Sequence, residues 1–163
     1  MGYLAQKLAI IKQHINREKQ MKRFVLAIML SLAPIVAMAE GVTHKVAIHV
    51  DENDPQVMNM ALNNAANVSA YYKSQGDDVV IEVVTYGPGL NMLIADKSPV
   101  AQRVATMSLE MENISFAACA NTMEAMKKNS GHDVVLLEEA NVVPSGVVRL
   151  IELQEDGYAY VRP

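Results

Sequence analysis

Apolar positions between residues 44 and 163 follow two alternating patterns. Short β-rich runs are followed by longer segments in which apolar residues recur every three or four positions. The short runs predict strands at residues 44–50, 78–86, 114–118, 141–144 and 158–161. Because helical segments separate these strands, the pattern predicts an α/β fold with a parallel sheet, helices on both faces and right-handed crossovers.

Capping residues mark the ends of the expected helices. Asp54 and Pro55 suit the start of the first helix, and Gly76 suits its end. Asn121, followed three residues later by a glutamate, predicts a capping box at the start of the helix after the third strand. Further helices are expected at residues 90–95, 98–111 and 145–157, while residues 133–140 fit either a helix or a strand.

The first 39 residues carry a different pattern. A basic pair at residues 22–23 precedes an apolar run at 24–36, and small residues at 37–39 complete the pattern of a secretory signal peptide. We therefore expect cleavage after Ala39, a mature domain of residues 40–163, a periplasmic location and no stable membrane span after cleavage. An uncleaved anchor is the alternative, although the run is shorter than the about 20 residues of a span. Residues 1–20 extend the basic region, unless Met21 is the true start.

Removal of this leader makes the chain strongly acidic. The leader holds six of the 14 Lys and Arg residues and one of the 18 Asp and Glu residues, so the mature domain has a net charge near −9. Nucleic-acid partners require a basic surface that this composition does not supply. The same balance argues against binding to anionic membranes.

Cys119 is the only cysteine in the sequence. It follows the third predicted strand and precedes a helix, and the N-terminus of a helix stabilises a thiolate. It is either a reactive nucleophile or a buried structural residue. At the same edge of the sheet we expect His49 and the turn at residues 86–89, where Gly87 and Gly89 let backbone approach a ligand. Cys119, His49 and an acidic residue together are an alternative metal site, but their spacing in the sequence is not that of a zinc site.

The mature chain resembles the DsrE/DsrF-like (YchN-like) family, in its exported single-domain branch. The segments that carry the resemblance run in order along the chain: KVAIHVDEND, ALNNAANV, TYGPGL, FAACANTM, VVPSGV and LQEDGYAYVRP. The resemblance implies a three-layer α/β/α sandwich with a mainly parallel five-stranded sheet, and a homotrimer or homohexamer. It also implies that Cys119 carries sulfur as a persulfide. His49, Asn64, Gly87, Gly89 and Asn121 are the candidate pocket residues.

The leading hypothesis is a periplasmic sulfur-handling protein. Cys119 would accept sulfane sulfur from a donor protein or small molecule and pass it to an acceptor, without a metal or an organic cofactor. The alternative is a non-catalytic oligomeric module that binds a small ligand, with Cys119 buried in the core. Thiol reactivity distinguishes the two hypotheses.

Overall fold

The computed structural model describes residues 7, 12, 14, 16–21 and 41–163. The chain divides into two compact units, Met1–Ala39 and Glu40–Pro163. Apart from Met21, the expected signal sequence lies outside the described residues. Among the described residues, no helix is long and apolar enough to cross a membrane.

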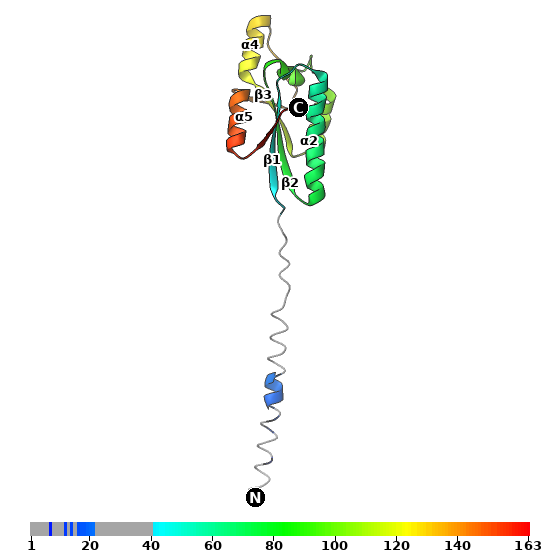
Figure 1. The fold of residues 1–163 in the computed structure, drawn as a ribbon, viewed down its shortest axis with the longest axis vertical. Helices are drawn as coiled ribbons and strands as arrows, with labels where there is room; N and C mark the ends of the chain where they lie inside the picture. Colours follow the sequence, from blue (N-terminus) through cyan, green and yellow to red (C-terminus); the bar gives the residue numbers. More distant parts are fainter. Residues whose placement is uncertain (1–6, 8–11, 13, 15, 22–40) are drawn as a thin grey trace. The chain divides into compact units, whose positions relative to one another are not determined.

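Five parallel strands form one sheet in the second unit (Figure 1). Their spatial order is β4-β3-β2-β1-β5, which places β2 in the centre. The strands are β1 (Thr43–Val50), β2 (Asp78–Thr85), β3 (Ile114–Cys119), β4 (Ala140–Val143) and β5 (Ala159–Val161). The predicted α/β fold is therefore confirmed, and the carboxyl ends of all described strands meet at one edge.

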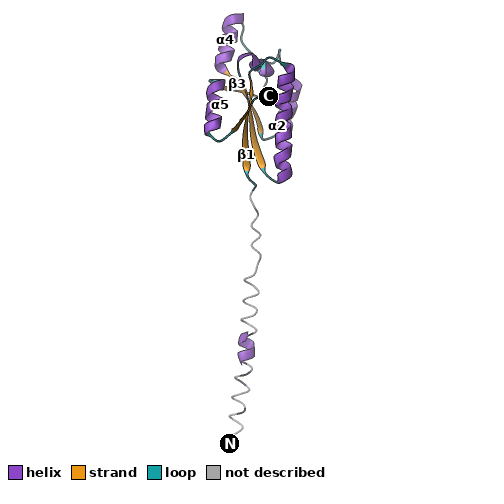
Figure 2. Cartoon of the chain, in the orientation of Figure 1, coloured by secondary structure: helices purple, strands orange, loops and turns teal. Residues whose placement is uncertain are grey.

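Helices cover both faces of the sheet (Figure 2). They are α2 (Pro55–Gln75), the 3₁₀ helix η1 (Gly87–Leu93), α3 (Ala101–Glu110), α4 (Ala120–Ser130) and α5 (Gly146–Glu155). One face packs against α2, α3 and η1 in the larger core. The other face packs against α5 in a smaller core. Figure 1 shows α2 and α5 on opposite sides of the strands.

The alternation of side chains along each strand separates these two cores. Ile48 and Phe116 point into the larger core, whereas their neighbours Ala47 and Ala117 point toward Leu150 of α5. The alanines are small, so α5 approaches the sheet closely. Because β1, β2 and β3 are covered on both sides, their central residues form nearly continuous apolar runs.

Capping explains where the first helix begins and why one prediction is wrong. Asp54 is the N-cap of α2, and its carboxylate accepts the Gln56 N–H at 2.7 Å. The predicted capping box at Asn121 does not form, because Cys119 is the N-cap of α4 and the helix begins at the next residue. The apolar run of β3 continues through Cys119, which leaves no loop between strand and helix.

The ambiguous segment at residues 133–140 is neither a helix nor a full strand. A single antiparallel bridge joins its Leu136 to Ile94, just after η1. The Leu137 N–H also donates to the Leu93 carbonyl at 2.9 Å. These bonds tie the segment to η1 and lead the chain into β4.

Candidate functional site

Cys119 lies at the carboxyl edge of the sheet, where β3 passes directly into α4. It is a free thiol with 4% of its surface exposed. Its side chain makes no capping hydrogen bond to α4. Polar groups at the starts of α4 and α5 nevertheless act on its sulfur atom through their effect on the thiol pKa.

These donors lower the pKa of the thiol. Burial raises the pKa of Cys119, but the Thr122 hydroxyl and the backbone N–H groups that face the sulfur lower it by more. The backbone donors belong to Gly146, Thr122 and Asn121. The first is at the start of α5 and the others are in the first turn of α4, so two helix N-termini favour the thiolate.

Thr122 is held in the orientation that this role requires. The Gly87 N–H donates to Thr122 Oγ1 at 3.0 Å. Since that bond occupies a lone pair of the hydroxyl oxygen, the hydroxyl proton is free to point at Cys119. Gly87 has φ of 53°, a backbone conformation that favours glycine. The predicted turn after β2 thus contributes through Gly87, by orienting a residue that the sequence reasoning missed.

Gly146 brings the second helix close to the site. A Cβ atom at this position would lie 2.8 Å from Tyr86 Cδ1, so a larger residue would displace either the ring or α5. Tyr86 follows β2 and fills the space between Gly146 and His49, on whose ring it stacks with centroids 4.6 Å apart. The ring of Tyr86 therefore joins the Cys119 site to the end of β1.

His49 is almost fully buried, with 4% of its surface exposed. Its Nδ1 shares a hydrogen bond of 2.7 Å with the Tyr160 hydroxyl. Its Nε2 is buried, has no hydrogen-bond partner among the described residues and lies 3.9 Å from Asp51 Oδ2. Burial lowers the pKa of His49, although the nearby Asp51 carboxylate opposes the shift. The ring is therefore neutral at neutral pH.

The other candidate residues from the sequence have different places. Gly89 packs against the backbone of β1, because a Cβ atom there would lie 2.2 Å from the Val50 carbonyl oxygen. Asn64 belongs to α2, which packs on the face of the sheet opposite α5, so it does not join the group around Cys119. Asn121 contributes its backbone N–H rather than its exposed side chain. Asp51 and Glu52, which follow β1, form ion pairs with Arg162.

A buried ion pair beneath α5 was also missed by the sequence reasoning. Arg149 binds both carboxylate oxygens of Glu82, each at 2.7 Å. The sequence did contain a sign of this ion pair, because Glu82 is a charged residue in the middle of a mostly apolar strand. Its partner could not be identified because Arg149 lies 67 positions away in the sequence.

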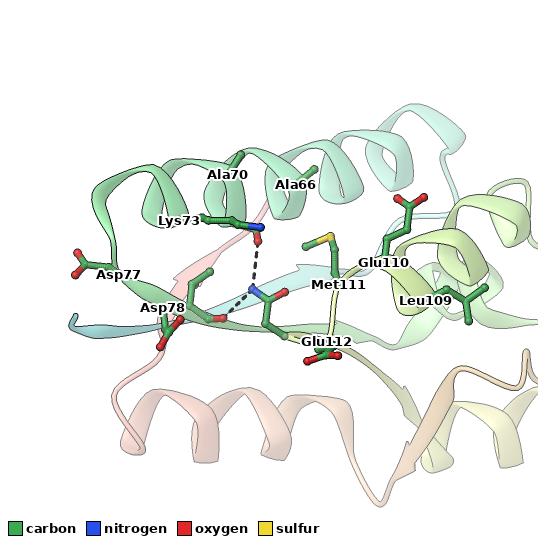
Figure 3. A pocket seen from close by; sticks show the side chains of 12 residues that line it. Ala66, Ala70, Lys73, Asp77, Asp78, Leu109, Glu110, Met111 and Glu112 are labelled. Carbon is green, nitrogen blue, oxygen red and sulfur yellow. Dashed lines mark hydrogen bonds between the residues drawn. The ribbon is translucent and has the colours of Figure 1, made fainter. Parts of the chain in front are cut away.

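Two hollows in the described part of the chain lie away from Cys119. Figure 3 shows one of about 620 Å³ at the amino edge of the sheet, between α2 and the residues that follow α3. Asn113 is one of the residues that line it and donates to Ser69 Oγ at 3.2 Å and to the Val79 carbonyl at 2.8 Å. As for metals, the described residues contain no group of three or more His, Cys, Asp or Glu side chains that could hold an ion.

Comparisons with known proteins found one matching family and a similar solved structure. The family model described as "DsrE/DsrF-like family" matches residues 44–163. A solved structure of a protein of unknown function, MTH1491 from Methanobacterium thermoautotrophicum, is similar, with 36% sequence identity and a TM-score of 0.62. That match covers 74% of this chain and 99% of the other. A search of curated proteins gave no match.

Proposed function

Since the chain belongs to the DsrE/DsrF-like family, which is linked to sulfur metabolism, we propose that it handles sulfur and that Cys119 carries it as a persulfide. The observation that supports this proposal is the set of donors around the thiol. The Thr122 hydroxyl and the backbone N–H groups at the starts of α4 and α5 lower the pKa of the thiol, against the effect of its burial. A lowered thiol pKa is characteristic of a reactive cysteine.

The chemistry is an exchange of sulfane sulfur. The Cys119 thiolate attacks the outer sulfur of a persulfide or polysulfide, R–S–S⁻. A new S–S bond forms to Cys119, the original S–S bond breaks, and R–S⁻ leaves with the bonding electron pair. The reverse attack, by the thiolate of an acceptor on the Cys119 persulfide, passes the sulfur on. Neither step needs a metal, an organic cofactor or an external oxidant.

The donors suit both forms of the sulfur centre. They stabilise the thiolate before the transfer, and a persulfide anion in the same place carries the same single charge. Because the donors are backbone groups and one oriented hydroxyl, they need little rearrangement when the charge moves outward by one atom.

The proposed setting is the periplasm. The pattern of residues 21–39 supports export. We also propose a homotrimer or homohexamer, which is supported by apolar side chains exposed on α5, with Val147 at 52% and Ile151 at 50%. The partners would then be a donor and an acceptor of sulfane sulfur outside the cytoplasm.

Intact mass spectrometry tests the persulfide directly. The mature protein is mixed with inorganic polysulfide, and Cys119→Ser is treated in parallel. We expect the wild-type protein to gain one or more sulfur atoms that reductant removes, and the variant to gain none. Equal gains in both proteins would refute a role for Cys119.

The second candidate function is a small-ligand-binding module with a structural Cys119. The observation in its favour is the burial of the thiol, of which only 4% is exposed. The rate of alkylation distinguishes the candidates. Reaction of the folded protein with iodoacetamide favours sulfur chemistry, whereas reaction only in denaturant favours the binding module.

A further inference from the structure

The ion pair of Glu82 and Arg149 joins a buried carboxylate to a half-buried guanidinium in a strict geometry. Two parallel bonds of 2.7 Å join the guanidinium to the carboxylate. The Glu82 side chain is 10% exposed and that of Arg149 is 31% exposed. A carboxylate beneath a helix is costly to bury, and a pair of apolar residues often serves stability equally well. The pair therefore needs an explanation beyond stability.

The positions of Glu82 and Arg149 in the fold supply such an explanation. Glu82 lies in the central strand, paired with Ala47 of β1 and Ser115 of β3, so its backbone is fixed on both sides. Arg149 lies in the first turn of α5, where its N–H donates to the Ser145 carbonyl at 2.9 Å. The pair thus ties the beginning of α5, rather than its middle, to the most constrained strand.

Gly146 lies in the same turn, three residues before Arg149 and three residues after Val143, which pairs with Cys119 between β3 and β4. The Asn121 N–H donates to the Pro144 carbonyl at 3.3 Å, which ties the start of α4 to the residues that lead into α5. The Gly146 N–H is among the groups that lower the pKa of Cys119. The other contacts of α5 in the smaller core are mainly apolar: Leu150 and Leu153 pack on alanines and a valine of the sheet, and Gly146 packs against the ring of Tyr86. Apolar packing has no preferred direction and tolerates small sliding movements. A bidentate ion pair has a fixed direction, and a hydrogen bond weakens steeply when its angle or length changes.

We propose that Glu82 and Arg149 are positioning residues for Cys119, which hold the first turn of α5 so that the Gly146 N–H stays directed at the sulfur. This proposal rests on the proposed function, since it concerns the same thiol. It assigns the pair no contact with the sulfur donor. Its effect on Cys119 passes through the placement of one backbone N–H.

A direct electrostatic effect of the pair would be small. Its two charges oppose each other, and neither residue is among the largest causes of the shift in the pKa of Cys119. Replacing both residues together leaves the net charge unchanged. The double variant Glu82→Leu/Arg149→Met therefore separates the placement of α5 from charge, and it leaves no unpaired charge in the core.

The experiment is a pH titration of the Cys119 thiol in the mature protein, from the rate of alkylation by iodoacetamide. In the double variant we expect a folded protein in which the thiol pKa rises by about one unit, as the loss of one hydrogen bond to a charged group implies. At pH values below both pKa values, alkylation should slow roughly three- to fourfold, because a higher pKa also makes the thiolate more nucleophilic.

Glu152→Gln is the matched control. Glu152 is the exposed second partner of Arg149, at 3.6 Å, so its loss should leave the thiol pKa unchanged. Arg149→Lys keeps the charge but not the two-bond geometry, and should raise the thiol pKa by a smaller amount.

A folded double variant with the wild-type thiol pKa would overturn the proposal. If the double variant does not fold, an unchanged pKa in Arg149→Lys would overturn it in the same way. An ordinary thiol pKa in the wild-type protein would instead overturn the proposed function, so the two failures are distinct.

Discussion

Replacing Thr122 by valine, which has a side chain of nearly the same shape, should change the reactivity of Cys119. The substitution removes the hydroxyl that faces the sulfur and that accepts the Gly87 N–H at 3.0 Å. A hydrogen bond to a charged group contributes about 1.5–3 kcal/mol, and one pKa unit corresponds to about 1.4 kcal/mol. The pKa of Cys119 should therefore rise by about one to two units.

Stability should fall as well, by an independent route. The Gly87 N–H loses its acceptor, and because Gly87 is only half-buried the cost should be near the lower end of the usual range, about 1 kcal/mol. For a domain of this size, that loss corresponds to a decrease in Tm of roughly 4 °C. Thermal unfolding followed by circular dichroism measures it.

The pH dependence of stability gives a third readout. Because the pKa of Cys119 is lowered in the folded state, the thiolate stabilises the fold above the unfolded pKa of about 8.5. This stabilisation is lost as the pH falls through the folded pKa. Raising the folded pKa in Thr122→Val should reduce the increase in stability between neutral and alkaline pH.

The control is Thr122→Ser, which keeps the hydroxyl. It should retain a thiol pKa close to that of the wild-type protein, measured from the pH dependence of alkylation. If the valine variant has the wild-type pKa, or if the serine variant shifts as much as the valine variant, the role assigned to the hydroxyl is wrong.

Three other substitutions test the surroundings of the site. Gly146→Ala should destabilise the fold by about 1–3 kcal/mol in denaturant titrations, with partial recovery when Tyr86→Ala makes room; no recovery would contradict the contact at 2.8 Å. Because burial lowers the pKa of His49, stability should decrease as the pH falls below about 6.5. His49→Phe should make this decrease less steep in thermal unfolding measured at pH 5–7. An equally steep decrease in the variant would assign the pH dependence to another group. Gly89→Ala should lower the yield of folded protein, because its Cβ would meet the rigid Val50 carbonyl at 2.2 Å; a stability equal to wild type would contradict this.

Most of the fold could be predicted because the relevant signals are local. The strands of the central sheet are continuous apolar runs, and the ends of α2 carry the residues that helix capping requires. The N-cap of α4 was misplaced by two residues, since a propensity argument favours Asn121 as N-cap over Cys119. The sequence cannot reveal locally that β3 enters α4 without a loop.

The site was harder to predict because its groups are distant in sequence. Cys119 and His49 could be chosen from their places at the ends of strands. Gly146 could not, because its role depends on how α5 lies against the sheet. The partner of His49, Tyr160, is 111 positions away in a three-residue edge strand that carries little pattern of its own.

The most direct test of the central claim is the pH dependence of sulfur loading by the folded mature protein. The gain of sulfur from inorganic polysulfide is followed by intact mass, with Cys119→Ser as the control. We predict that the variant gains no sulfur and that the wild-type rate levels off at a pH below the ordinary thiol pKa of about 8.5. Loading of the serine variant, or loading of the wild-type protein only after it has been unfolded, would contradict the assignment of Cys119 as a sulfur carrier.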